Sequence, residues 1–179
     1  MPRIPVTPST ALLRQPGPTE GTGSQVRQGP EHPRRDVALA GRAPVLRRAA
    51  VGHRRLRIFR GPHPGAIALA VGNADDCSYC QAAHTGGGKA VGLTDDEMVA
   101  IPRGAANLDP ELATLLALAR EYAKGGGSVQ DSTWQSALDA RWTEEQLTEL
   151  SVHVTLNLVT NYFDHFVQTE LDLPAAPVI

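Results

Sequence analysis

Both cysteines of the chain lie in one eight-residue stretch that also contains a histidine. The stretch is Cys77-Ser78-Tyr79-Cys80-Gln81-Ala82-Ala83-His84. If it is helical, Cys77 and Cys80 stand at i,i+3 and Cys80 and His84 at i,i+4, so the three side chains share one face. Two neighbouring thiols beside an imidazole that can exchange a proton predict dithiol redox chemistry.

Local signals predict that this stretch opens a helix. Asp75 and Asp76 precede it as expected cap residues, and the residues after Cys80 propagate a helix well. Cys77 would then lie in the first turn, where backbone N–H groups and the positive end of the helix dipole favour a thiolate. Neutral His84 could take a proton from Cys80, and protonated His84 could stabilise its thiolate.

Two other interpretations fit the same residues. The cysteines and His84 could bind zinc with His153 or His165 as a fourth ligand, but the sequence holds no second cysteine pair. The cysteines could also be two small buried hydrophobic residues. The zinc interpretation lacks the usual second cysteine pair, and the second interpretation does not account for the spacing together with the acidic residues and the histidine. We therefore expect a redox site with no metal and no other cofactor.

The chain has 179 residues, enough for one domain with a core that needs no disulfide. The longest apolar run near the cysteines covers only the six residues 66–71, and no signal-like segment opens the chain. We therefore expect neither a membrane partner nor secretion. The sequence predicts a cytoplasmic protein, a setting in which a lone Cys-x-x-Cys is more often catalytic than structural.

Charge divides the chain near residue 65. Residues 1–65 contain 12 arginines, no lysine and 3 acidic residues, whereas residues 66–179 carry 5 basic and 16 acidic residues. The first part also holds 10 of the 14 prolines, which predicts an irregular, disordered basic segment. Such a segment could bind nucleic acid, but only Phe59 offers an aromatic ring among its arginines, so no nucleic-acid partner is expected.

From residue 66 onward the sequence predicts an all-α domain. The first expected helices are a short buried one at 66–71, the cysteine helix from Cys77 to about Val91 with Gly92 past its end, and one from a capping box at Thr94 to about Pro102. A further helix should run from Asp109-Pro110 to the glycines at 125–127. A short helix capped by Asp131 or Ser132 and a long one at about 144–168, opened by a capping box at Thr143, complete the domain. No strand pattern interrupts them.

The long last helix carries a polar stripe. His153, Asn157, Asn161 and His165 recur at four-residue intervals, flanked by apolar residues. The favoured interpretation is a solvated or hydrogen-bonded polar face. The alternative is that the stripe faces a subunit interface or a water-filled approach to the cysteines.

Residues 66–179 resemble the carboxymuconolactone decarboxylase and AhpD-like alkylhydroperoxidase family, particularly its peroxidase-related members. The resemblance rests on the segments AIALAV, CSYCQAAH, GLTDDE and LNLVTNYFDH. It implies an all-α fold, homo-oligomers such as trimers or hexamers, a hydroperoxide substrate and a dithiol electron donor.

The resemblance also implies roles for individual residues. Cys80 would be the peroxidatic cysteine that attacks the hydroperoxide, Cys77 would resolve the sulfenic acid into a disulfide, and His84 would belong to the proton relay. The helix-terminus argument above favours Cys77 as the more acidic thiol instead. At this stage we follow the resemblance for the order of attack.

The chain departs from the family pattern upstream of the cysteines. The family relay includes a glutamate twelve residues before the first cysteine, and here that position is Gly65. The expected N-terminal helices are not recognisable in residues 10–65, although MPRIP resembles a family start. We interpret the intervening segment as the product of a reading-frame error.

These observations predict a thiol-dependent hydroperoxide reductase impaired by its N-terminal segment. One alternative is a catalytically crippled homologue that acts as an oligomeric or binding protein. Another is a decarboxylase acting on a lactone, against which the cysteine pair argues because that chemistry needs no dithiol.

Overall fold

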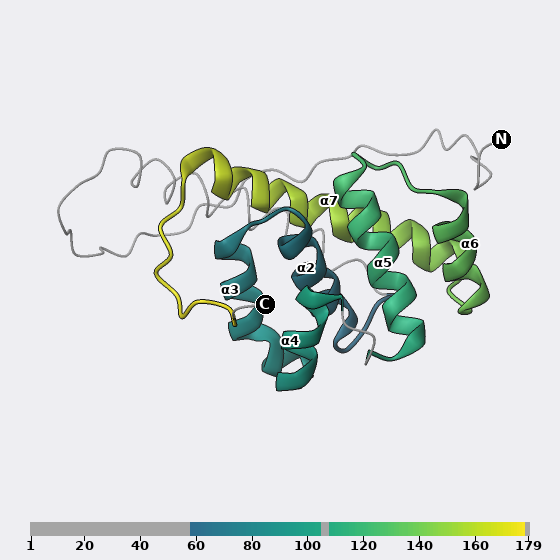
Figure 1. The fold of residues 1–179 in the computed structure, drawn as a ribbon, viewed down its shortest axis with the longest axis horizontal. Coiled ribbons are helices and arrows are strands. Elements are labelled where there is room, and N and C mark those ends of the chain that lie inside the picture. The colour runs from purple at the N-terminus through teal and green to yellow at the C-terminus, as the bar shows by residue number, and fades with distance from the viewer. Residues whose placement is uncertain (1–57, 105–107, 178–179) are drawn as a thin grey trace, which may run out of the picture.

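The computed structural model describes residues 58–104 and 108–177, which form helices and no strands (Figure 1). The elements are α2 (His63–Ala74), α3 (Ser78–Gly88), the 3₁₀ turn η1 (Lys89–Val91), α4 (Asp95–Arg103), α5 (Pro110–Lys124), α6 (Asp131–Asp139) and α7 (Glu144–Val167). The predicted all-α class is confirmed. The irregular segment expected at 1–65 lies mostly outside the described residues. Within them, no helix is both long and apolar enough to cross a membrane.

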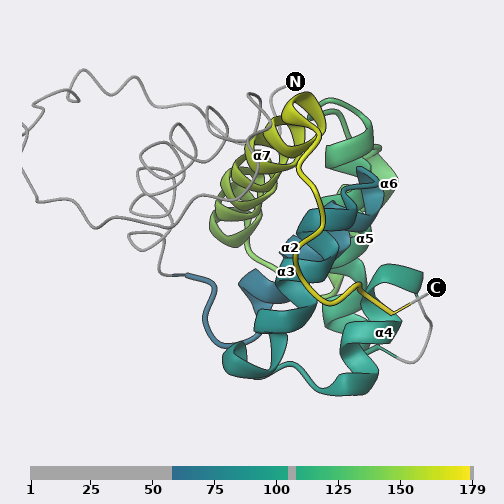
Figure 2. The same ribbon diagram turned by 90° about the vertical axis from the view of Figure 1, so that its left-hand side faces the viewer.

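Helix α2 is the centre of the fold. Every residue from Ala66 to Gly72 is buried, so this helix is apolar all round. A helix of that kind must be surrounded, and α2 packs against α3, α4, α5 and α7 (Figures 1 and 2). The cysteine helix α3 is therefore positioned by its contact with the most buried element of the domain.

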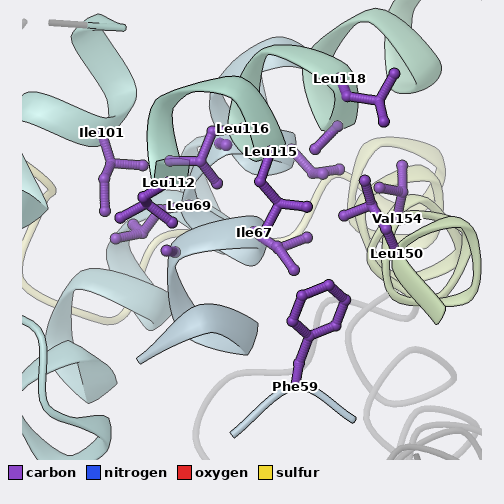
Figure 3. Packing of buried hydrophobic residues seen from close by; sticks show 14 of the residues in the cluster. Phe59, Ile67, Leu69, Ile101, Leu112, Leu115, Leu116, Leu118, Leu150 and Val154 are labelled. Carbon is purple, nitrogen blue, oxygen red and sulfur yellow. The ribbon is translucent and has the colours of Figure 1, made fainter. Parts of the chain in front are cut away.

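The packed core begins before residue 66. Phe59 is only 5% exposed and lies beside Ile67 of α2 and near Leu150 and Val154 of α7 (Figure 3). The boundary expected at residue 65 therefore falls inside α2 and inside the core. The proline-rich composition around Phe59 hid this, because a single aromatic ring anchors the segment without any periodic pattern.

Most of the predicted helix boundaries are confirmed. Capping boxes at Thr94 and Thr143 open α4 and α7, and the carboxylate of Asp109 caps α5. The cysteine helix continues through η1 and ends at Gly92, whose φ of 96° is a left-handed conformation suited to glycine.

The predicted cap of α6 is wrong. Asp131 is the first helical residue, and the cap position is Gln130, whose side chain makes no capping hydrogen bond. Gln130 instead donates its backbone N–H to Oε1 of Glu121, at 2.6 Å. The contact across the loop from α5 thus fixes the start of α6 in place of a local cap.

The polar stripe of α7 is largely buried, so a solvated face is wrong, whereas a hydrogen-bonded one is confirmed for His153, which contacts Glu149, and for Asn157, which donates to the His153 carbonyl. His153, Asn157 and Asn161 are 2%, 6% and 1% exposed, and only His165 reaches solvent. An α-helix turns about 100° per residue, so three steps of four residues drift by about 120°. The buried line therefore continues from Asn161 to Asp164, which is three residues further on, and leaves His165 at its edge.

Candidate active site

The turn between α2 and α3 fixes the backbone of the first cysteine. Asp76 has a left-handed φ of 52°, and its N–H donates to the carbonyl of Asn73. The next N–H, of Cys77, donates to the carbonyl of Gly72 at 2.9 Å. These two bonds make a Schellman motif, which ends α2 and begins α3 within three residues.

Cys77 is itself the cap of α3. Its Sγ accepts the backbone N–H of Cys80 at 3.2 Å. The expectation that Asp75 and Asp76 cap this helix is wrong, because both are used to terminate α2. The thiol thus takes the place normally held by a serine or aspartate oxygen, and it lies against the positive end of the helix dipole.

An aspartate that is not among the predicted site residues contacts the second cysteine. Sγ of Cys80 donates to Oδ2 of Asp164 at 3.4 Å, and Asp164 is 5% exposed. Its other carboxylate oxygen accepts the hydroxyl of Thr169 at 2.8 Å. The N–H of Thr169 also donates to the Asp164 carbonyl at 3.1 Å, so the end of α7 holds this carboxylate in place.

His165 lies beside the same turn. Its Nε2 is 2.8 Å from the carbonyl of Asp75 and 3.5 Å from Oδ2 of that residue. This hydrogen bond raises the pKa of His165, and the charges of Asp75, Cys77 and Asp164 add to the effect. The imidazole also stands in the last turn of α7, where the helix dipole favours a cation. Of the two histidines proposed as a fourth zinc ligand, His165 is the one beside the cysteines.

A cavity of about 350 Å³ opens between the start of α3 and the end of α7. It is lined by Asp76, Cys77, Ser78, Tyr79, Asp164, His165, Gln168 and Thr169. In Figure 1 the C-terminal end of α7 lies over the α2–α3 turn, which is consistent with the hydrogen bond between His165 and Asp75. Among the described residues, Cys80 and His84 do not belong to its lining.

The two thiols differ in acidity. The pKa of Cys77 is lowered, chiefly because the Cys80 side chain donates a hydrogen bond to its sulfur, and this outweighs burial. The pKa of Cys80 is strongly raised, first because its thiol is that donor and then because of burial and the nearby charges of Cys77 and Asp164. The site therefore favours one thiolate at Cys77 and one thiol at Cys80.

The remaining predicted residues lie further from the cavity. His84 is half-buried on α3, one turn after Cys80. Gly65, where the family has its relay glutamate, lies in the first turn of α2, and a Cβ there would be 2.8 Å from Cγ2 of Val91. A side chain at Gly65 would thus meet the side chains of Val91 and Leu93.

Three potential metal-binding atoms converge at the cysteine pair. The ligand atoms of Cys77, Cys80 and Asp164 all lie within 4.8 Å of one another. A tetrahedral zinc site needs a fourth ligand, which a water molecule can supply. The same three groups serve dithiol chemistry without a metal, because the carboxylate can exchange a proton with the adjacent thiol.

Comparisons with known proteins agree with the sequence resemblance. Residues 66–121 match the model of the carboxymuconolactone decarboxylase family. No curated protein matches the chain. The fold is similar to the crystal structure of a protein of unknown function from Agrobacterium tumefaciens, described as a candidate antioxidant defence protein AhpD. That match has a TM-score of 0.55 and 14% identity, and it covers 80% of this chain and 94% of the other.

The matched segment begins with the buried residues of α2 and includes both cysteines and the first helices after them. At 14% identity the structural likeness shows the fold alone. The resemblance inferred from the sequence is therefore confirmed: residues 66–121 match the model of the carboxymuconolactone decarboxylase family, and the domain has an AhpD-like fold.

Proposed function

We propose that the chain is a thiol-dependent hydroperoxide reductase in which Cys77 and Cys80 cycle between a dithiol and a disulfide. The observation that carries this proposal is the pair of free cysteines, one of which lines a cavity while the other contacts a buried carboxylate. A hydroperoxide supplies the oxidising oxygen, and a small dithiol returns the electrons. Such a cycle suits a reducing compartment such as the cytoplasm.

The cavity favours an uncharged substrate. Asp76 and Asp164 both line it, and two carboxylates in a confined space repel an anion. A volume of about 350 Å³ is at the small end of the range for ligand pockets. We therefore propose a small neutral alkyl hydroperoxide as the substrate class.

His84 and Gly65 determine how much acid–base catalysis the proposed site retains. His84 stays in the proposal as a relay residue on α3, while the glycine at position 65 supplies no carboxylate. General acid–base help is typically worth about 100- to 10,000-fold in rate, so a site that lacks one relay group retains slow chemistry. Gly65 is also the observation that favours the alternative of a crippled homologue with an oligomeric or binding role.

The direct test is peroxide consumption with cumene hydroperoxide and dithiothreitol. We expect slow turnover that is lost in Cys77→Ser and in Cys80→Ser, and faster turnover when the N-terminal segment is replaced by an in-frame family N-terminus. Peroxide should convert two free thiols per chain to none without intermolecular dimers, and dithiothreitol should restore both. Equal rates for the wild type and both serine variants would refute the proposal and favour the crippled homologue.

Zinc analysis separates the metal alternative. Stoichiometric zinc in the purified protein that is lost in Cys77→Ser, Cys80→Ser and Asp164→Asn would point to a metal site instead, because these residues supply the three converging ligand atoms. We expect no stoichiometric zinc after purification under reducing conditions.

We also propose that the protein forms a homo-oligomer, as the family resemblance implies. An exposed apolar stripe on the outer side of α7 supports this, and it comprises Val152, Val159, Tyr162 and Phe166. Phe166 is 86% exposed, which is unfavourable for a monomer in water. Sedimentation velocity of the wild type and of Phe166→Asp tests it, with a shift toward monomer expected in the variant.

A further inference from the structure

We propose that Cys77 is the thiol that attacks the hydroperoxide and that Asp164 takes the proton of Cys80 when Cys80 closes the disulfide. This inference rests on the proposed function and reverses the order of attack that the family resemblance implies. It is drawn from the cavity, from the helix cap and from the carboxylate at the end of α7.

The cavity distinguishes the two cysteines where exposure does not. Cys77 and Cys80 are 2% and 4% exposed, so overall exposure separates them by too little to decide. Cys77 forms part of the cavity wall together with residues from α7, whereas Cys80 is not part of that wall. A substrate in the cavity therefore meets Cys77 before Cys80.

The backbone prepares Cys77 to be a thiolate. Its Sγ occupies the cap position of α3 and accepts the N–H of Cys80, so negative charge on the sulfur is stabilised by a hydrogen bond and by the helix dipole. His165 lines the same cavity, and its hydrogen bond to the Asp75 carbonyl favours the imidazolium form. The imidazolium can then supply a proton to the leaving oxygen.

The surroundings of Cys80 instead favour its protonated thiol. Its thiol has a single hydrogen, which Asp164 or the Cys77 sulfur can accept. Both acceptors favour the protonated thiol, since a thiolate there would face a carboxylate and a second sulfur anion. Cys80 is thus suited to wait as a thiol and to lose its proton only after Cys77 has been oxidised.

The Cys77 thiolate attacks the outer peroxide oxygen, an S–O bond forms and the O–O bond breaks, and the alkoxide leaves as an alcohol with the proton of His165. The Cys80 thiol then passes its proton to Asp164 and attacks Sγ of Cys77. An S–S bond forms, the S–O bond breaks, and hydroxide takes the proton from Asp164 to leave as water. A dithiol donor reduces the disulfide and becomes oxidised.

The first experiment needs no peroxide. The full reduced chain is pulsed with limiting iodoacetamide between pH 5 and 9, and fragmentation mass spectrometry assigns the adduct to each cysteine. We expect Cys77 to react at least about tenfold faster than Cys80 near neutral pH, because the thiolate is the nucleophile. Equal labelling, or faster labelling of Cys80, would overturn the proposed order.

The same experiment on Asp164→Asn tests the carboxylate. Loss of the negative charge should increase labelling of Cys80, while the rate of disulfide closure after a single dose of peroxide should fall by about 100-fold or more. A merely structural role would not move these two rates in opposite directions. Asp139→Asn is the matched control, because Asp139 is exposed on α6 and accepts a hydrogen bond from the side chain of Gln135. Unchanged rates in Asp164→Asn would remove Asp164 from the mechanism.

The second experiment traps the sulfenic acid. With cumene hydroperoxide and dimedone, Cys80→Ser should give one adduct on Cys77, and Cys77→Ser should give none on Cys80. Circular dichroism checks that both variants fold. An adduct on Cys80 with peroxide consumption in the wild type would overturn the order of attack and leave the proposed function standing. Faster alkylation of Cys77 in a wild-type chain that consumes no peroxide would refute the function, and with it the order of attack, and would leave only the greater acidity of Cys77 established.

Discussion

Helix α7 carries a buried carboxylate near each end, and the two are held in different ways. Glu149 is 6% exposed and Asp164 is 5% exposed, so burial does not distinguish them. Glu149 accepts the N–H groups of Ile58 and Phe59 at 3.1 and 3.0 Å and faces His153 at 3.3 Å. Asp164 is hydrogen-bonded to one hydroxyl and one thiol and lines a cavity.

The hydrogen-bond partners of Glu149 and Asp164 differ in whether they can transfer a proton. Backbone N–H groups cannot give up a proton at ordinary pH, and rings pack around the Glu149 end, where Phe59 meets His153 and Trp142 with centroids 5.7 and 5.6 Å apart. A thiol beside a carboxylate can transfer its proton, and the adjacent cavity can hold a substrate. The chemistry of the partners, more than burial, therefore separates an anchor from a reactive site.

The largest expected effect is on the aromatic packing of the anchor end. Phe59→Ala should lower the free energy of unfolding by about 3 to 5 kcal/mol, because it empties a buried ring-sized space. Leu171→Ala is the control, since that side chain is 43% exposed and lies outside the stripe proposed for the oligomer, and its loss should change stability by about 0.5 kcal/mol or less. Urea denaturation followed by circular dichroism measures both. Similar losses would mean that Phe59 does not belong to the core.

Replacing each carboxylate by its amide compares the two ends directly. Glu149→Gln places an NH₂ group against a backbone N–H donor, and we expect a loss of about 2 to 3 kcal/mol. Asp164→Asn keeps one oxygen for Thr169 and turns an NH₂ toward Cys80, whose sulfur can accept it, so the loss should be about 1 kcal/mol or less. Urea midpoints at pH 7 give the result. A larger loss at Asp164 would reverse the assignment of anchor and reactive site.

The sequence was sufficient for the local features of this fold. Thr94, Thr143 and Gly92 act through residues within one helical turn, and their capping roles were predicted because short-range hydrogen bonds need no tertiary information. The spacing of Cys77 and Cys80 likewise predicted a pair at the start of a helix.

The partners of the cysteines and of the entry segment could not be predicted in this way. Asp164 meets Cys80 across 84 positions of sequence, and Glu149 meets Phe59 across 90. Both contacts depend on how α7 is rotated against α2 and α3. A stripe drawn at strict four-residue spacing selected His165, whereas the helical period of 3.6 residues would have selected Asp164 as well.

Acid should lower the free energy of unfolding through Glu149 and His153, which lie in the N-terminal half of α7. Hydrogen bonds from Phe59, Ile58 and His153 outweigh burial and lower the pKa of Glu149, so its contribution is present above the unfolded pKa and is lost as pH falls through the folded pKa. Burial lowers the pKa of His153 despite Glu149, so the unfolded chain gains a proton first below about pH 6.5. Both groups make the protein less stable in acid.

Urea denaturation between pH 4 and 8 measures this acid response. In Glu149→Gln the fall of stability on the acid side should be shallower than in the wild type, and Asp139→Asn serves as the exposed control. An acid response of equal steepness in Glu149→Gln and the wild type would show that other groups control it.

The smallest effect on stability is expected at His165, near the C-terminal end of α7, and its pH dependence has the opposite sign to that of Glu149 and His153. The Asp75 carbonyl raises the pKa of His165, and the charges of Asp75, Cys77 and Asp164 also favour the imidazolium. Its stabilising contribution is therefore complete below the unfolded pKa and is lost as pH rises through the folded pKa. Because the side chain is 46% exposed, solvent screens these charges, and His165→Asn should cost only about 0.5 kcal/mol at pH 5.5 and less at pH 8.5.

The Cys77 thiolate connects this small effect to the chemistry of the site. In Cys77→Ser one of the negative charges that favour the His165 imidazolium is gone, so the pKa of His165 should fall. NMR titration of the His165 ring in the wild type and in Cys77→Ser measures this, with Cys80→Ser as the matched control. We expect the larger decrease in Cys77→Ser, since Cys77 is the residue proposed to hold the negative charge. A larger decrease in Cys80→Ser would instead place the thiolate on Cys80, and it would overturn the order of attack, which depends on Cys77 being the more acidic of the two thiols.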